Sequence, residues 1–191
     1  MRTRHLIAAA LSLTFAAHAH AGGADGFTTF EVGSAEHGGV VTEFFSFDTP
    51  ESQSGWQAPG ALEHERVPFI QTAHQEVQAR GYYAALLLAD QGEHEAFQKA
   101  MFAASRQGQA ATSEAAVVRL AEASGYDAEI FKRVMSGNAV GAKVGYAKEL
   151  AAQMKPQALP TVVVEGKYRT DPQVAGGPDR MVKVLDRLVA R

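Results

Sequence analysis

The chain contains no cysteine. The thiolate is the reactive form of cysteine in disulfide exchange and a common ligand of zinc, so the absence excludes thiol chemistry and thiolate metal sites of the chain's own. The fold must also be stabilised without disulfide bonds. Tryptophan is scarce as well, because Trp56 is the only one.

Long apolar runs are nearly absent. Residues 6–17 form an apolar segment shorter than the roughly 20 residues that a membrane-spanning helix needs. Arg2 and Arg4 precede this segment, and the small-x-small pattern Ala19-His20-Ala21 follows it. These features predict a secretory signal over 1–21 and therefore export from the cytoplasm. A retained membrane anchor is the less favoured alternative.

Positive charge is in deficit after residue 21. The remaining residues hold 16 Lys and Arg against 21 Asp and Glu, a net charge of −5. This balance argues against a nucleic-acid partner. The 170 residues after position 21 are enough for one domain with a full core, or for a small domain that carries an insertion.

Strand patterns lie near both ends of the chain. Residues 27–32 alternate between apolar and polar, and 40–47 are continuously apolar, as in a strand buried on both faces. Residues 67–72 can form a third strand. A hairpin is predicted from 161–165 through Gly166-Lys167 to 168–169.

Helical periodicity dominates the middle of the chain, over 73–154, and returns in an amphipathic helix at 178–190. Ser113 is a candidate N-cap, and Gly125 and Gly137 are candidate helix ends. Between 50 and 64 we expect only a short or frayed helix, since glycine and proline interrupt it. The order of elements is that of a mixed α/β (α+β) protein.

Three separated segments together resemble the DsbA family of periplasmic thiol:disulfide interchange proteins. They are 27–47 with its Phe-Phe-Ser-Phe strand end, 118–137 with Ala123-Ser-Gly-Tyr-Asp127, and 159–173 with Leu-Pro-Thr-Val-Val-Val. The resemblance implies a thioredoxin fold interrupted by a helical insertion and, together with the signal, a location in the periplasm. The thioredoxin-like domain would comprise 22–72 and 155–191, and the insertion, with the linking helix, 73–154.

The resemblance places the family's redox motif at Thr49-Pro50-Glu51-Ser52, where both cysteines are replaced. Redox activity therefore does not carry over. We expect Thr49 or Asp48 to cap the following helix, and Ser52 to face solvent.

A second inherited feature is a candidate peptide-binding site. Leu159-Pro160 resembles the family's cis-proline dipeptide, which implies backbone hydrogen bonds to an extended peptide. Trp56 is placed close to the degenerate turn, where it could anchor a peptide or simply cover the core. Glu43 resembles a buried acid beneath the turn, expected to be hydrated or hydrogen-bonded. It has no convincing lysine partner within 67–72.

The favoured function is a non-catalytic, chaperone-like or assembly factor that binds extended peptides or a periplasmic partner protein. One alternative is a cysteine-free enzyme of the kappa glutathione transferase or isomerase type that uses Thr49 or Ser52. Another is an inactive or cysteine-replaced variant of a thiol:disulfide interchange protein. No cofactor and no membrane contact after signal cleavage are expected.

The four histidines after residue 21 show no zinc-motif spacing, so no metal site is expected. They are His37, His64, His74 and His94. Tyr82-Tyr83 and the leucines at 86–88 are predicted to lie in the core of the insertion.

Overall fold

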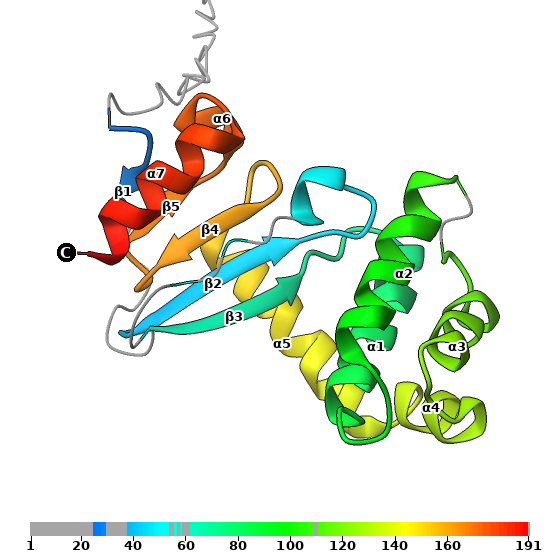
Figure 1. The fold of residues 1–191 in the computed structure, drawn as a ribbon. Coiled ribbons are helices and arrows are strands. Elements are labelled where there is room, and N and C mark those ends of the chain that lie inside the picture. Colours follow the sequence, from blue (N-terminus) through cyan, green and yellow to red (C-terminus); the bar gives the residue numbers. More distant parts are fainter. Residues whose placement is uncertain are drawn as a thin grey trace, which may run out of the picture.

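Figure 1 shows a computed structural model of the chain, with a sheet on one side and a cluster of helices on the other. The structure describes residues 25–29, 38–53, 56, 58, 62–108 and 111–190. The expected signal at 1–21 and the histidine at position 37 lie outside these residues. No helix in the described ranges is both long and apolar enough to cross a membrane.

The described residues form a five-stranded sheet of order β1-β5-β4-β2-β3. Strands β2 and β3 are parallel, and the other neighbours are antiparallel. The strands are β1 (Thr28–Thr29), β2 (Val40–Phe45), β3 (Glu63–Pro68), β4 (Thr161–Val164) and β5 (Tyr168–Thr170). The central position of β2 explains its continuous apolar sequence, because both of its faces are covered.

The third strand was predicted over 67–72, and this is wrong: β3 runs over Glu63–Pro68. Its first four residues are all ionisable, which concealed the strand. Two of them, His64 and Arg66, lie on the face that carries an acid of β2, so the charges are paired within the sheet. Pro68 ends this strand at the edge of the sheet. A proline lacks the N–H that would hydrogen-bond to a neighbouring strand, and this lack is tolerated at an edge.

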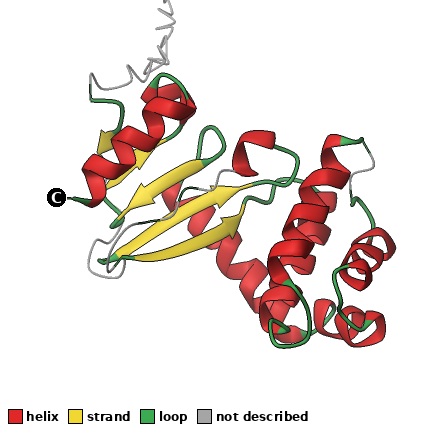
Figure 2. Ribbon diagram, in the orientation of Figure 1, coloured by secondary structure: helices red, strands yellow, loops and turns green. Residues whose placement is uncertain are grey.

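Helices α1 to α5 connect β3 to β4, and Figure 2 shows this region as helix joined by short loops. They are α1 (Ala73–Leu87), α2 (His94–Arg106), α3 (Glu114–Ala123), α4 (Ala128–Met135) and α5 (Asn138–Met154). The side chains of Thr72, Ser113 and Asp127 cap three of them, each worth about 1 kcal/mol. The order of the strands in the sheet and the block of helices between β3 and β4 confirm the thioredoxin fold with a helical insertion.

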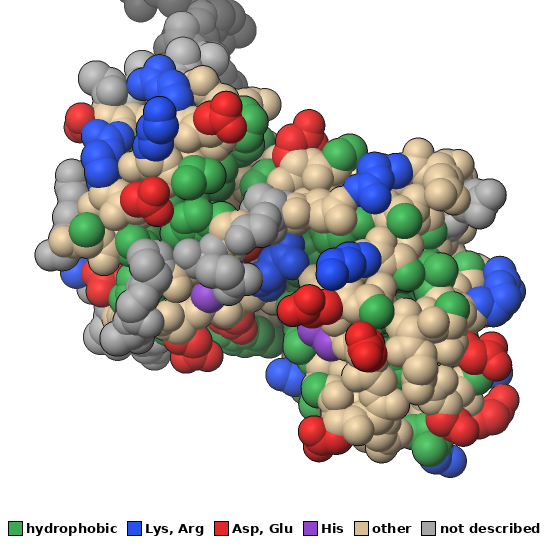
Figure 3. Space-filling model, viewed as in Figure 1, with side chains coloured by type: hydrophobic (Ala, Val, Ile, Leu, Met, Phe, Trp, Pro, Cys, Tyr) green, Lys and Arg blue, Asp and Glu red, His purple; other side chains and the backbone are tan. Residues whose placement is uncertain are grey.

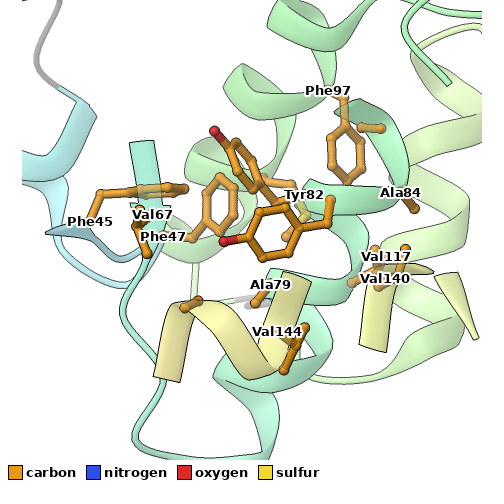
Figure 4. Close-up of a cluster of buried hydrophobic side chains, with 14 of the residues drawn as sticks. Phe45, Phe47, Val67, Ala79, Tyr82, Ala84, Phe97, Val117, Val140 and Val144 are labelled. Carbon is orange, nitrogen blue, oxygen red and sulfur yellow. The ribbon is translucent and has the colours of Figure 1, made fainter. Parts of the chain in front are cut away.

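The larger of two hydrophobic cores fills the space between these helices and the sheet. Tyr82 and Tyr83 are buried in it as predicted, and Figure 4 shows Phe45, Phe47 and Tyr82 in one aromatic group. The leucines at 86–88 behave differently from the prediction. Leu86 and Leu87 are 39% and 44% exposed, because they end α1 on its outer side, and only Leu88 is buried.

The smaller core lies on the opposite face of the sheet, under α7 (Pro178–Val189). The hairpin before it turns one residue earlier than predicted, because β4 ends at Val164 and Glu165 already has a left-handed backbone (φ 51°). The short helix α6 (Pro172–Ala175) was not predicted, since one turn leaves no periodicity to detect.

Candidate functional site

The degenerate redox turn forms only a short 3-10 helix, η1 (Pro50–Gln53). Most of the span between it and β3, where a short or frayed helix was expected, lies outside the described residues. Ser52 was expected to face solvent, and this is wrong: it is fully buried, and its Oγ accepts from the Ser46 N–H at 3.3 Å. A buried hydroxyl held in this way does not favour the enzyme alternative that uses Ser52.

The carboxylate of Asp48 does not cap the following helix, contrary to one of the two caps expected. Its two oxygens are bonded to α1 instead, one to Nε2 of His74 at 2.9 Å and the other to the amide of Gln78 at 3.1 Å. The Thr49 carbonyl accepts from the Ser52 N–H at 2.9 Å, which is the first main-chain bond of the 3-10 helix itself and not a side-chain cap. The turn is thus anchored to the insertion by side-chain bonds.

Glu43 is buried in β2 and has two partners on β3. Arg66 Nη2 donates to one of its oxygens at 3.2 Å, and His64 Nε2 lies 3.1 Å from the other. The expected hydrogen-bonded acid is therefore present. No lysine partner was predicted within 67–72, and the basic partner is an arginine one position earlier, Arg66, which stands opposite Glu43 in the sheet. Removing the Arg66 charge would leave the buried Glu43 carboxylate with His64 as its one remaining partner among the described residues.

The Arg66 guanidinium joins the sheet, the turn and the insertion. Nη2 also donates to the Ser52 carbonyl at 2.7 Å, and Nη1 donates to Gln98 of α2 at 2.9 Å. The same group stacks over the Phe45 ring at 4.5 Å. The Gln98 amide donates in turn to His94 at 2.8 Å. Burial, aided by the positive charge of Arg66, lowers the pKa of His94 below its usual 6.5.

The Leu159–Pro160 peptide bond is cis, as the resemblance implied. Pro160 is buried at the start of β4, and Leu159 is half-buried against the larger core. Within the described part of the chain, no group forms a hydrogen bond with the Leu159 main chain. An incoming peptide backbone could therefore pair with its N–H and carbonyl.

Trp56 packs against the smaller core, in keeping with the reading that it covers the core, while its role as a peptide anchor stays a prediction. Its ring lies edge-on to His64 at 5.4 Å between centroids, and its Nε1–H donates to Asp186 of α7 at 3.4 Å. Trp56 and Pro160 line the same open cavity of about 220 Å³. The structure thereby brings together the predicted residues Glu43, Glu51, Trp56 and Pro160.

The wall of this cavity opposite Trp56 and η1 was not predicted, and it is formed by residues of α6 and α7. Met181, Val182 and Leu185 supply its apolar surface, and Asp179 stands in the first turn of α7. The apolar stripe of α7 was predicted as core, but Val182 lies outside the stripe and is 40% exposed. In the sequence, the valine beside the amphipathic stripe of α7 was the only sign that this helix also presents an apolar surface outside the core.

Metal ligands are not gathered at this site. Within the described residues, no three His, Asp or Glu side chains are arranged as a metal ion would require.

Comparison with known proteins points to one family. The model of the DSBA-like thioredoxin domain matches residues 60–189. The thiol:disulfide interchange protein DsbA of Pseudomonas syringae is 30% identical over 97 residues, which cover 51% of this chain and 45% of that protein. DsbA of Pseudomonas aeruginosa is 37% identical over 67 residues, 35% of this chain and 32% of that protein. The matched region thus spans less than half the length of these curated relatives.

Solved structures share the fold at lower identity. A crystal structure of Pseudomonas aeruginosa DsbA gives a TM-score of 0.73 at 23% identity, covering 86% of this chain and 91% of that one. A cysteine-to-serine variant of Proteus mirabilis DsbA, solved with the non-covalently bound peptide PWATCDS, gives 0.68 at 17% identity, covering 87% and 96%.

Proposed function

Because this chain belongs to the DSBA-like thioredoxin domain family and contains no cysteine, we propose that it is a non-catalytic peptide-binding protein of the periplasm. The observation that carries the proposal is the cavity beside the cis Leu159–Pro160 bond, walled by Trp56 and α7. The bound species is an extended segment of an unfolded or partner protein, and the role is chaperone-like or in assembly.

Peptide binding needs no thiol at this site. An extended peptide gains affinity from main-chain bonds and specificity from pockets for individual side chains. The main chain of Leu159, which has no hydrogen-bond partner among the described residues, can supply the main-chain bonds. The adjoining cavity can serve as a pocket for a side chain. A relative of the same fold holds a peptide without a covalent bond in its cysteine-to-serine form, which supports the proposal.

Calorimetry with a permanently unfolded protein tests the proposal. Reduced and carboxamidomethylated lactalbumin is titrated into the chain and into Trp56→Ala and Pro160→Thr. We expect saturable binding that weakens about tenfold or more in both variants, because each alters a wall of the cavity. Leu87→Ala is the control, since it removes an exposed apolar side chain of the insertion. Absence of binding, or equal loss in the control, would refute peptide binding at this cavity.

A further inference from the structure

The charges around the cavity are of one sign. The charged residues among those that line it are Glu43, Glu51 and Asp179, and the other described lining residues are apolar or aromatic. Glu43 is already paired with Arg66 and His64. Glu51 and Asp179 are exposed, and neither has an ion-pair partner among the described residues.

Among the described residues that line the cavity, none is a lysine or an arginine. Helix α7 does carry Arg180, Lys183 and Arg187, yet none of them is among the lining residues. Arg187 is directed elsewhere, since its guanidinium donates to the carbonyls of Lys183 and Asp25. Within the described part of the chain, the two carboxylates therefore have no lysine or arginine beside them at the cavity wall.

The apolar walls suit the stem of a long cationic side chain. The lining by Trp56, Met181, Leu185 and three prolines can cover methylene groups, and an indole face attracts a guanidinium or ammonium group. The cavity has a volume of about 220 Å³. Cavities that bind drug-sized ligands are larger, at about 300–1,000 Å³. This cavity has room for one side chain. In Figure 3, hydrophobic side chains gather between α7 and η1, with acidic side chains on both sides.

We infer that the cavity takes the side chain of an arginine or lysine of the bound peptide, with its charged group between Glu51 and Asp179 and its stem against Trp56. This inference rests on the proposed function and adds the class of peptide to it. An acidic or purely apolar peptide would leave both carboxylates without a counter-charge.

The single tryptophan gives a direct reading, since emission from this protein reports Trp56. Three acetylated and amidated heptapeptides are titrated that differ only at the central residue, which is arginine, norleucine or glutamate. We expect the arginine peptide to bind about tenfold more tightly than the norleucine peptide at low salt. The preference shrinks as salt rises, because the carboxylates are exposed. The glutamate peptide binds most weakly.

Matched variants assign the preference to the two carboxylates. The double variant Glu51→Gln with Asp179→Asn should bind the arginine and norleucine peptides equally. The control, Glu122→Gln with Glu129→Gln, removes two exposed acids of α3 and α4 and should keep the preference. Figure 1 places these helices at the far end of the molecule from α7.

The outcomes separate this inference from the proposed function. Equal or tighter binding of the norleucine peptide overturns the preference for a cation and leaves peptide binding intact. No response of Trp56 to any of the three peptides refutes both. Emission that changes with protein concentration alone identifies a second copy of the chain as the occupant, and this also overturns the inference.

Discussion

The two faces of the central sheet are stabilised in different ways. The face toward α1 and α5 meets a large apolar core, to which Phe44 and Val163 contribute from the sheet. On the face toward α7, Val41 and Val162 are apolar, but Glu43 lies beside them and is bonded across the strands. One face relies on packing, and the other combines packing with a buried ion pair next to a cavity.

This difference separates stability from binding. A cavity and a buried charge both cost free energy unless something compensates for them. The helical core can supply that stability, while Arg66 satisfies the acid and holds the turn in place. The absence of cysteine excludes thiol chemistry, but the elements that shape the cavity do not depend on a thiol.

The largest effect is expected in the helical core. Phe97→Ala removes a fully buried ring that contacts Tyr126 and Phe131, and should lower the free energy of unfolding by about 3–5 kcal/mol. Urea denaturation measures the loss. Peptide affinity of the folded fraction should stay unchanged, and a matching fall in affinity would show that the two faces are not independent.

Breaking the ion pair on the other face should cost nearly as much. Arg66→Met leaves Glu43 with His64 alone and frees the Ser52 carbonyl, for a loss of about 3 kcal/mol. Adding Glu43→Gln should recover part of this loss, because the buried charge is then gone. A double-mutant cycle by denaturation measures the coupling. Strictly additive losses would contradict a paired Glu43 and Arg66.

A smaller, pH-dependent effect is expected at His94, where the core meets the Arg66 network. Burial lowers its pKa in the folded chain, so the unfolded chain takes up the proton first as pH falls. Stability should be level above about pH 6.5 and decline below it until the folded pKa is reached. Melting temperatures from pH 8 to 5 test this.

His94→Gln serves as the control for that pH profile, because its side chain can still accept from Gln98 without titrating. The decline below about pH 6.5 should become shallower in this variant. An unchanged profile would mean that another group is responsible.

The smallest effect concerns the surface of the helical part. Lys148 of α5 donates to Glu76 of α1 at 2.7 Å, and this bond lowers the pKa of Glu76. The stabilisation is therefore present above pH 4.5 and is lost as pH falls through the folded pKa. Lys148→Met should cost about 0.5 kcal/mol at pH 7 by urea denaturation. A loss as large as that of Arg66→Met would contradict the ranking.

Much of the fold could be predicted from the sequence where a local pattern is decisive. The apolar run of β2, the hairpin from Thr161 and the amphipathic α7 each carry their own periodicity. The charged strand β3 could not be recognised in this way, because its pairing with Glu43 depends on a neighbour more than 20 residues away. Ser52 was misplaced although the partner of its hydroxyl, the main chain of Ser46, is only 6 positions away, because a bond between a side chain and the main chain leaves no periodicity in the sequence.

The candidate site was predicted in part. Trp56, Glu43 and Pro160 were identified one by one, but their common cavity depends on α7, and the contact between Trp56 and Asp186 joins residues 130 positions apart. No short-range pattern reports such a distance. The acidic character of the site therefore emerged only from the folded chain.

Chemical-shift mapping of the ¹⁵N-labelled chain with the arginine heptapeptide tests peptide binding at the cavity most directly. We expect the Trp56 indole N–H and the amides of Leu159, Val162 and Met181 to shift in a saturable manner, while those of α3 and α4 stay in place. No saturable shift, or shifts confined to the helical part of the molecule, would contradict a peptide site beside Pro160.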